Sequence, residues 1–122
     1  MTARSNGALA DAAKTQWSLP HNVSASMREE LRCAYLDWGK RGAEEDYRRA
    51  CLAAALGNSY RLTGLLARAI PTNPDERVEQ DIAMAKANHD VLAAERALKD
   101  ATMRARGAYL TYQGLLANAV QT

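Results

Sequence analysis

The segment Pro71-Thr72-Asn73-Pro74 constrains the fold more than any other part of this chain. A proline ring is not accommodated inside an α-helix, so Pro71 is predicted to end one helix. Asn73 is a favoured N-cap residue, and Pro74 then occupies the first position of the next helix, with Glu76 three residues after the cap. The chain is therefore predicted to form two helical units, at about residues 26–70 and 74–120.

The composition predicts an all-α fold. Hydrophobic residues make up 48% of the chain, many of them alanine, and phenylalanine is absent. Alanine, leucine, arginine and glutamate are strong helix formers, whereas β-branched residues are few and alternate with polar ones nowhere for long. We expect a helical bundle built from two tandem helical units with long antiparallel helices.

A short sequence repeat supports the tandem organisation. The run Gly-Leu-Leu-Ala-Arg-Ala-Ile at 64–70 returns as Gly-Leu-Leu-Ala-Asn-Ala-Val at 114–120, and the same offset aligns Gly57 with Gly107. Glycine and alanine would allow close contact between helices. We therefore expect the two copies to pack against each other or across an interface between subunits.

The first helical unit carries two apolar stripes. Ser26 and Glu29 form a predicted capping box at its start. The first stripe consists of Met27, Leu31, Ala34, Tyr35 and Trp38, and the second of Tyr47, Cys51, Ala54, Asn58, Leu62, Leu65 and Ala69. The second is rotated by roughly 180° from the first. Either the chain turns between Gly39 and Gly42, or one long helix changes the face that it buries, and the glycines favour a break or kink.

The second unit shows the same change of face. Its first stripe consists of Val78, Ile82, Ala85, His89 and Leu92, and its second of Val91, Leu98, Ala101, Ala105, Ala108, Tyr112, Leu116 and Ala119. No glycine or proline marks this change, so one helix is predicted from Pro74 to at least Arg106, with Gly107 as a candidate kink. A two-helix hairpin cannot cover both stripes, which predicts self-association or a protein partner.

The first 23 residues differ from the rest and are predicted to form a flexible N-terminal arm, followed by a single helical-bundle domain at 24–122. Trp17 and Leu19 are large apolar residues near Pro20, which disfavours helix at the position before it. We expect them to dock on the helical body or on a neighbouring subunit.

No residue pattern indicates catalysis. Two cysteines and two histidines lack the close spacing of a zinc site, so we expect no metal and no cofactor. A phosphate-binding glycine loop and a nucleophile elbow are also missing from the sequence. His89 falls on an apolar stripe, where a packing or interface role is the simplest interpretation. The chain is predicted not to be an enzyme.

Protein–protein interaction through helices is therefore the predicted function, with oligomerisation expected. The candidate interface residues are the large apolar ones, namely Trp17, Leu19, Tyr35, Trp38, Tyr109, Tyr112, Leu115 and Leu116. The alternative is a small helical nucleic-acid-binding regulator that would use Lys40, Arg41, Arg48 and Arg49. Against it, acidic residues at 44–46 would repel phosphates.

The expected setting follows from composition. A net charge of +2 does not by itself indicate nucleic acid, and no run reaches the ~18 apolar residues of a membrane span. We expect no membrane association and a cytoplasmic location, or incorporation in a virion. The excess of arginine over lysine and the many alanines suggest a bacterial or phage accessory protein: an adaptor, an assembly component or an inhibitor.

Overall fold

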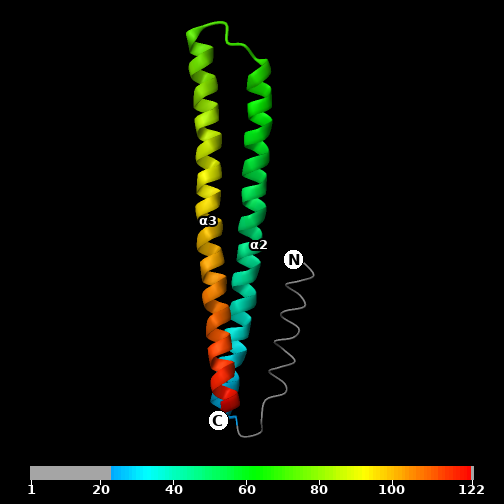
Figure 1. Cartoon of the computed structure of the whole chain (residues 1–122), viewed down its shortest axis with the longest axis vertical. Helices are drawn as coiled ribbons and strands as arrows, with labels where there is room; N and C mark the ends of the chain where they lie inside the picture. The colour runs from blue at the N-terminus through cyan, green and yellow to red at the C-terminus, as the bar shows by residue number, and fades with distance from the viewer. Residues whose placement is uncertain (1–22, 122) are drawn as a thin grey trace. The chain divides into compact units, whose positions relative to one another are not determined.

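The computed structural model describes residues 23–121, which form two long helices, α2 (Ala25–Arg68) and α3 (Pro74–Gln121), and no strand (Figure 1). The helices pack against each other as a hairpin. The all-α prediction is confirmed. Trp17 and Leu19, with the rest of the predicted arm up to residue 22, lie outside the described residues.

The chain divides into two compact units, which each contain a segment of both helices. Unit 1 combines the chain up to Asp46 with the chain from Asp100 onward, and unit 2 is Tyr47–Lys99. Unit 2 includes the connection between the helices, and unit 1 includes the start of α2 and the end of α3. Each unit is treated separately below.

Helix α2 begins at Ala25 because Ser24, rather than Ser26, is its N-cap. The Ser24 hydroxyl accepts a hydrogen bond from the backbone N–H of Met27 at 3.0 Å, and the Ser24 carbonyl accepts one from Arg28 at 3.0 Å. Glu29 instead accepts a hydrogen bond from Arg32 Nε at 2.9 Å. The predicted capping box was therefore wrong, since Ser24 offers the same hydroxyl two residues earlier.

The predicted start of α3 is confirmed. The Asn73 side-chain oxygen accepts a hydrogen bond from the backbone N–H of Glu76 at 2.9 Å, and Pro74 is the first helical residue. The Glu76 carboxylate accepts a hydrogen bond from the backbone N–H of Thr72 at 2.9 Å. These two bonds tie Glu76 to the connection between the helices.

Neither helix breaks at its glycines. Helix α2 runs without interruption through Gly39 and Gly42, so the turn favoured by the sequence is absent, and α3 likewise runs through Gly107. One glycine in a helix interior costs about 1 kcal/mol relative to alanine, which the surrounding strong helix formers offset. A long helix at this point was the correct alternative.

The buried face of α2 does not change either. Its more buried positions keep one spacing of three and four residues: Leu31, Ala34, Trp38, Arg41 and Glu45 in unit 1, then Arg48, Leu52, Ala55, Ser59, Leu62 and Leu66 in unit 2. The predicted second stripe was wrong, because Tyr47, Leu65 and Ala69 are exposed. Arg41, Glu45 and Arg48 are half-buried at this spacing, so charged residues interrupt the apolar pattern between the two units.

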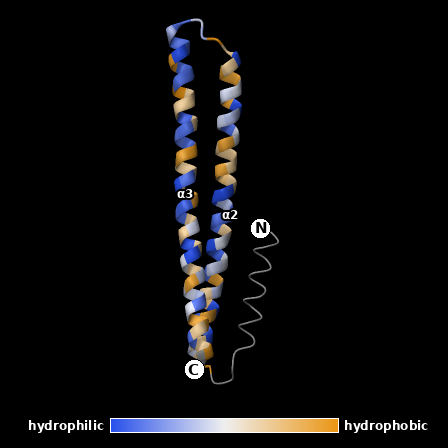
Figure 2. Ribbon diagram, viewed as in Figure 1, coloured by the Kyte–Doolittle hydropathy of each residue, from blue (hydrophilic) through white to orange (hydrophobic). Residues whose placement is uncertain are grey.

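Helix α3 follows the same seven-residue spacing, as expected where two helices pack like a coiled coil. Its inner positions are Gln80, Met84, Ala87, Val91, Ala94 and Leu98 in unit 2, then Ala101, Ala105, Ala108, Tyr112, Leu115 and Ala119 in unit 1. The predicted second stripe of this helix is thus confirmed as inward-facing. The hydropathy colouring shows that hydrophobic segments alternate with hydrophilic ones along both helices (Figure 2).

The repeated Gly-Leu-Leu-Ala segments do not bring helices into close contact. An added Cβ at Gly64 or at Gly114 would meet no other atom within 4 Å. The first copy lies in unit 2 and the second in unit 1. The predicted packing of the two copies against each other within the chain was therefore wrong, and packing across an interface between subunits stays a prediction.

Candidate protein-interaction site

The first apolar stripe of α3, in unit 2, faces away from the helix pair. We call Val78, Ile82, Ala85, His89 and Leu92 the outer stripe; all five are exposed. The three largest aliphatic side chains keep more than half of their surface open, at 56% for Val78, 63% for Ile82 and 52% for Leu92. The sequence correctly identified an apolar stripe here, but the hairpin does not cover it.

The position of the outer stripe follows from its phase. Val78 and Ile82 each precede an inner residue, Gln80 and Met84, by two positions. At 3.6 residues per turn, two positions correspond to about 200° around the helix. Since Met84 faces α2, Ile82 must face outward. The spacing of four, three, four and three residues along the outer stripe is that of a second coiled-coil seam.

Unit 2 buries little on its inner face. Within residues 47–99, Ala87 is the one hydrophobic residue that is buried, whereas Val78, Ile82 and Leu92 are exposed. Val78, Ile82 and Leu92 therefore lie where the hairpin does not cover them, while Met84 and Val91 face inward. A contiguous exposed apolar stripe with polar edges is the surface typical of protein–protein contact.

Charged and polar side chains border the outer stripe. Glu79 and Lys86 lie along one edge, and Asp81 and Asn88 along the other, and all four are exposed. The Asp81 carboxylate also forms an ion pair with Arg77 Nε at 3.3 Å. The edge with Glu79 and Lys86 thus carries a negative and a positive charge, seven residues apart.

The interface residues predicted in unit 1 come together as the core of that unit. Tyr35 and Trp38 of α2 meet Tyr112 of α3, with ring centroids 6.1 Å and 5.8 Å apart, respectively. Trp38 also meets Tyr109 edge-on at 5.0 Å. Leu115 and Leu116 pack against the same cluster. These side chains hold the two helices of unit 1 together. Tyr109 lies at the edge of the cluster and is 40% exposed.

Tyr112 lies at the centre of this cluster. Its side chain is completely buried, and burial raises the pKa of its hydroxyl above the ordinary value. Leu31, Val23 and Ala119 complete the buried core around it. Tyr112 therefore contributes to the stability of unit 1 and has no surface to offer a partner.

The four basic residues predicted to contact nucleic acid fall in different units. Lys40 and Arg41 belong to unit 1, where Arg41 lies 3.5 Å from the Asp37 carboxylate. Arg48 and Arg49 belong to unit 2, where the Arg48 guanidinium lies 5.4 Å from the Tyr47 ring centroid. The structure therefore does not assemble the four into one basic surface within either unit.

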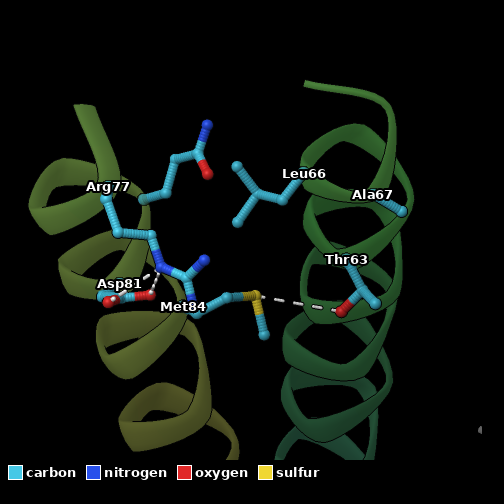
Figure 3. Close-up of a pocket in the computed structure, with 7 residues that line it drawn as sticks. Thr63, Leu66, Ala67, Arg77, Asp81 and Met84 are labelled. Atoms are coloured by element: carbon cyan, nitrogen blue, oxygen red, sulfur yellow. Dashed lines mark hydrogen bonds and ion pairs between the residues drawn. The ribbon is translucent and has the colours of Figure 1, made fainter. Parts of the chain in front are cut away.

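A shallow depression of about 350 Å³ lies between the two helices of unit 2 (Figure 3). Its polar groups already bind neighbouring atoms: Gln80 donates to the Ala69 carbonyl at 3.1 Å, and Arg77 pairs with Asp81. The Thr63 hydroxyl lies 2.9 Å from the Ser59 carbonyl and faces the Met84 sulfur. The polar groups that line this depression thus interact with neighbouring protein atoms and do not form a recognisable ligand-binding site.

The described residues hold no cluster of side chains suited to a metal ion, and none of the described helices is apolar over a length that would cross a bilayer. Cys33 and Cys51 are free thiols. His89 is exposed on the outer stripe.

The candidate interface residues named from the sequence were large aromatic and leucine side chains, and they did not include the outer stripe. The sequence pattern that could have indicated the outer stripe as a candidate interface is the seven-residue spacing, which both faces of α3 follow between residues 78 and 98. Comparisons with models of protein families, with curated proteins and with solved structures find no match to this chain.

Proposed function

We propose that this chain is a non-enzymatic protein-interaction protein that binds through the outer stripe of α3. The observation that supports the proposal is the exposure of Val78, Ile82 and Leu92 on one helical face. Helix-mediated recognition uses apolar anchors at this spacing, which insert between the side chains of a facing helix or groove. Such a protein would serve as an adaptor, an assembly component or an inhibitor in a bacterial or phage system.

Nucleic-acid binding is the weaker candidate. Arg41 already pairs with Asp37, and Arg48 lies against Tyr47. Affinity for phosphates needs several free cations on one surface, and these pairs compete with it.

The proposal is tested by placing a photo-crosslinking amino acid at Ala85 in the full chain and, as a matched control, at the exposed Ala53 of α2. In the source cells we expect a discrete adduct from position 85 that Ile82→Glu abolishes. Because Ile82 is exposed, this substitution should leave helicity by circular dichroism unchanged. Equal adducts from positions 85 and 53, or an adduct that survives Ile82→Glu, would contradict the proposal.

A further inference from the structure

We propose that the occupant of the outer stripe is the outer stripe of a second copy of this chain, packed antiparallel. This inference rests on the proposed function and names its partner. It is argued from the spacing of the stripe and from the charges along its edges.

The stripe is self-complementary when reversed. An antiparallel seam places Ile82 of one chain opposite Ala85 of the second copy, and the two-fold axis repeats this pair. The next layer on each side places Val78 opposite His89 of the second copy. A large side chain thus faces a small one at the centre. Four members of the stripe face another member, and Leu92 lies at the end of the seam, opposite Asp75 of the second copy.

The same register pairs opposite charges. Glu79 and Lys86 lie along one edge of the stripe. In this register Glu79 lies beside Lys86 of the second copy, offset by about 3 Å along the axis at 1.5 Å per residue. The two-fold axis generates this pair twice. On the other edge, Asp81 lies beside Asn88 of the second copy, so no like charges meet.

Parallel pairing lacks this complementarity at the ends of the seam. In a parallel pair, every stripe residue would lie beside the same residue of the second chain. Continuing the spacing of the stripe reaches Asp75 at one end and Arg96 at the other, so a parallel pair would bring like charges together at both ends. The antiparallel register avoids both clashes.

The stripe is short, which predicts a weak dimer. Residues 78–92 span about 21 Å of helix at 1.5 Å per residue. Such a seam buries less surface than a standard protein–protein interface, so association should depend steeply on protein concentration.

The decisive experiment is sedimentation equilibrium of the full chain at low salt, over a wide range of concentration. The variants are Lys86→Glu, Glu79→Lys and the double exchange of both. Each single variant turns two attractive pairs into two repulsive ones, so we expect dimer dissociation constants raised at least about fivefold. The double exchange should restore the wild-type constant. Lys40→Glu makes the same charge change on an exposed residue of unit 1 and should have no effect.

Each outcome distinguishes the two proposals. Dimerisation without rescue by the double exchange overturns the antiparallel register. A wild-type chain that stays monomeric at every concentration overturns self-pairing; an Ile82-dependent crosslink from Ala85 to a different protein would then leave the proposed function standing. A monomer with no such crosslink overturns both.

Discussion

Units 1 and 2 are built from the same two helices, yet they bury very different side chains. Of the eight buried residues in the described part of the chain, seven lie in unit 1 and only Ala87 lies in unit 2. Unit 1 buries Tyr112 and Leu31 completely on its inner face. The inner face of unit 2 includes Ala55 and Ser59, and its larger residues, such as Met84, are only half-buried. The difference shows that the seven-residue spacing sets which face is inward, while the residues on that face set how much it buries.

Unit 2 places three of its large aliphatic side chains outside its inner face. Ile82, Val78 and Leu92 sit on the opposite face of α3. Unit 1 buries an aromatic core within the chain, although Leu36, Met103 and Leu110 remain exposed. Unit 2 keeps a hydrophobic stripe that a second helix can cover. If the hairpin consisted of two repeats of one unit, the large hydrophobic side chains would lie on the same faces of the helices in both units.

The largest expected effect contrasts one tyrosine in each unit. Tyr112 is completely buried and Tyr60 is 73% exposed. Tyr112→Ala removes a large ring from the core of unit 1 and should lower the free energy of unfolding by about 3–5 kcal/mol. Tyr60→Ala should change it by less than about 0.5 kcal/mol. Urea unfolding followed by circular dichroism measures both, and equal effects would show that the two units do not differ as described.

A smaller effect is expected at Gly57 of unit 2 and Gly107 of unit 1, which the repeat aligns. Both lie inside helices, and an added Cβ would meet nothing within 4 Å at either. Alanine at each position should therefore raise the free energy of unfolding by about 0.5–1 kcal/mol. The same urea titration provides the test. If alanine lowered the free energy of unfolding at Gly57 alone, the added methyl group would be disturbing a contact that unit 2 makes at this position.

The smallest effect concerns one carboxylate in each unit. The backbone N–H of Thr72 holds the pKa of Glu76 below 4.5, and the Arg32 side chain holds the pKa of Glu29 below the same value. A lowered folded-state pKa means that each carboxylate stabilises the helix above the unfolded pKa, and that this contribution disappears as pH falls through the folded-state value.

Both groups are exposed to solvent, so the effect on stability should be slight. NMR titration of the two carboxyl carbons measures the shifts directly. Arg32→Gln should raise the pKa of Glu29 toward its ordinary value and leave the pKa of Glu76 unchanged, because the donor to Glu76 is the Thr72 backbone in the connection between the helices. A change in both titrations would contradict the assignment of separate partners.

Most of the secondary structure could be read from the sequence. Asn73 and Pro74 fixed where α3 begins, because their effects act through neighbouring backbone groups, whereas α2 already ends at Arg68, before Pro71. Ser24 and Ser26 could not be told apart in this way, since both offer a capping hydroxyl within one turn. Gly39 and Gly42 suggested a break that the surrounding helix formers override.

The candidate site was predictable only in part. The sequence identified every member of the outer stripe, yet it assigned the interface to Tyr35, Trp38 and Tyr112, which form the core of unit 1. Large aromatic side chains suit a core and an interface equally well. Only the position of the neighbouring helix in the tertiary structure shows whether such a side chain lies in the core or on the surface.

The sequence by itself determined that the chain is helical, where α3 begins, and that α3 carries two apolar faces. The tertiary structure decided which face is covered. Periodicity measures the direction of a side chain about its own helix axis, and that direction says nothing about where the neighbouring helix lies. Packing of α2 along Met84, Ala87 and Val91 settled this for unit 2 and left Val78, Ile82 and Leu92 exposed.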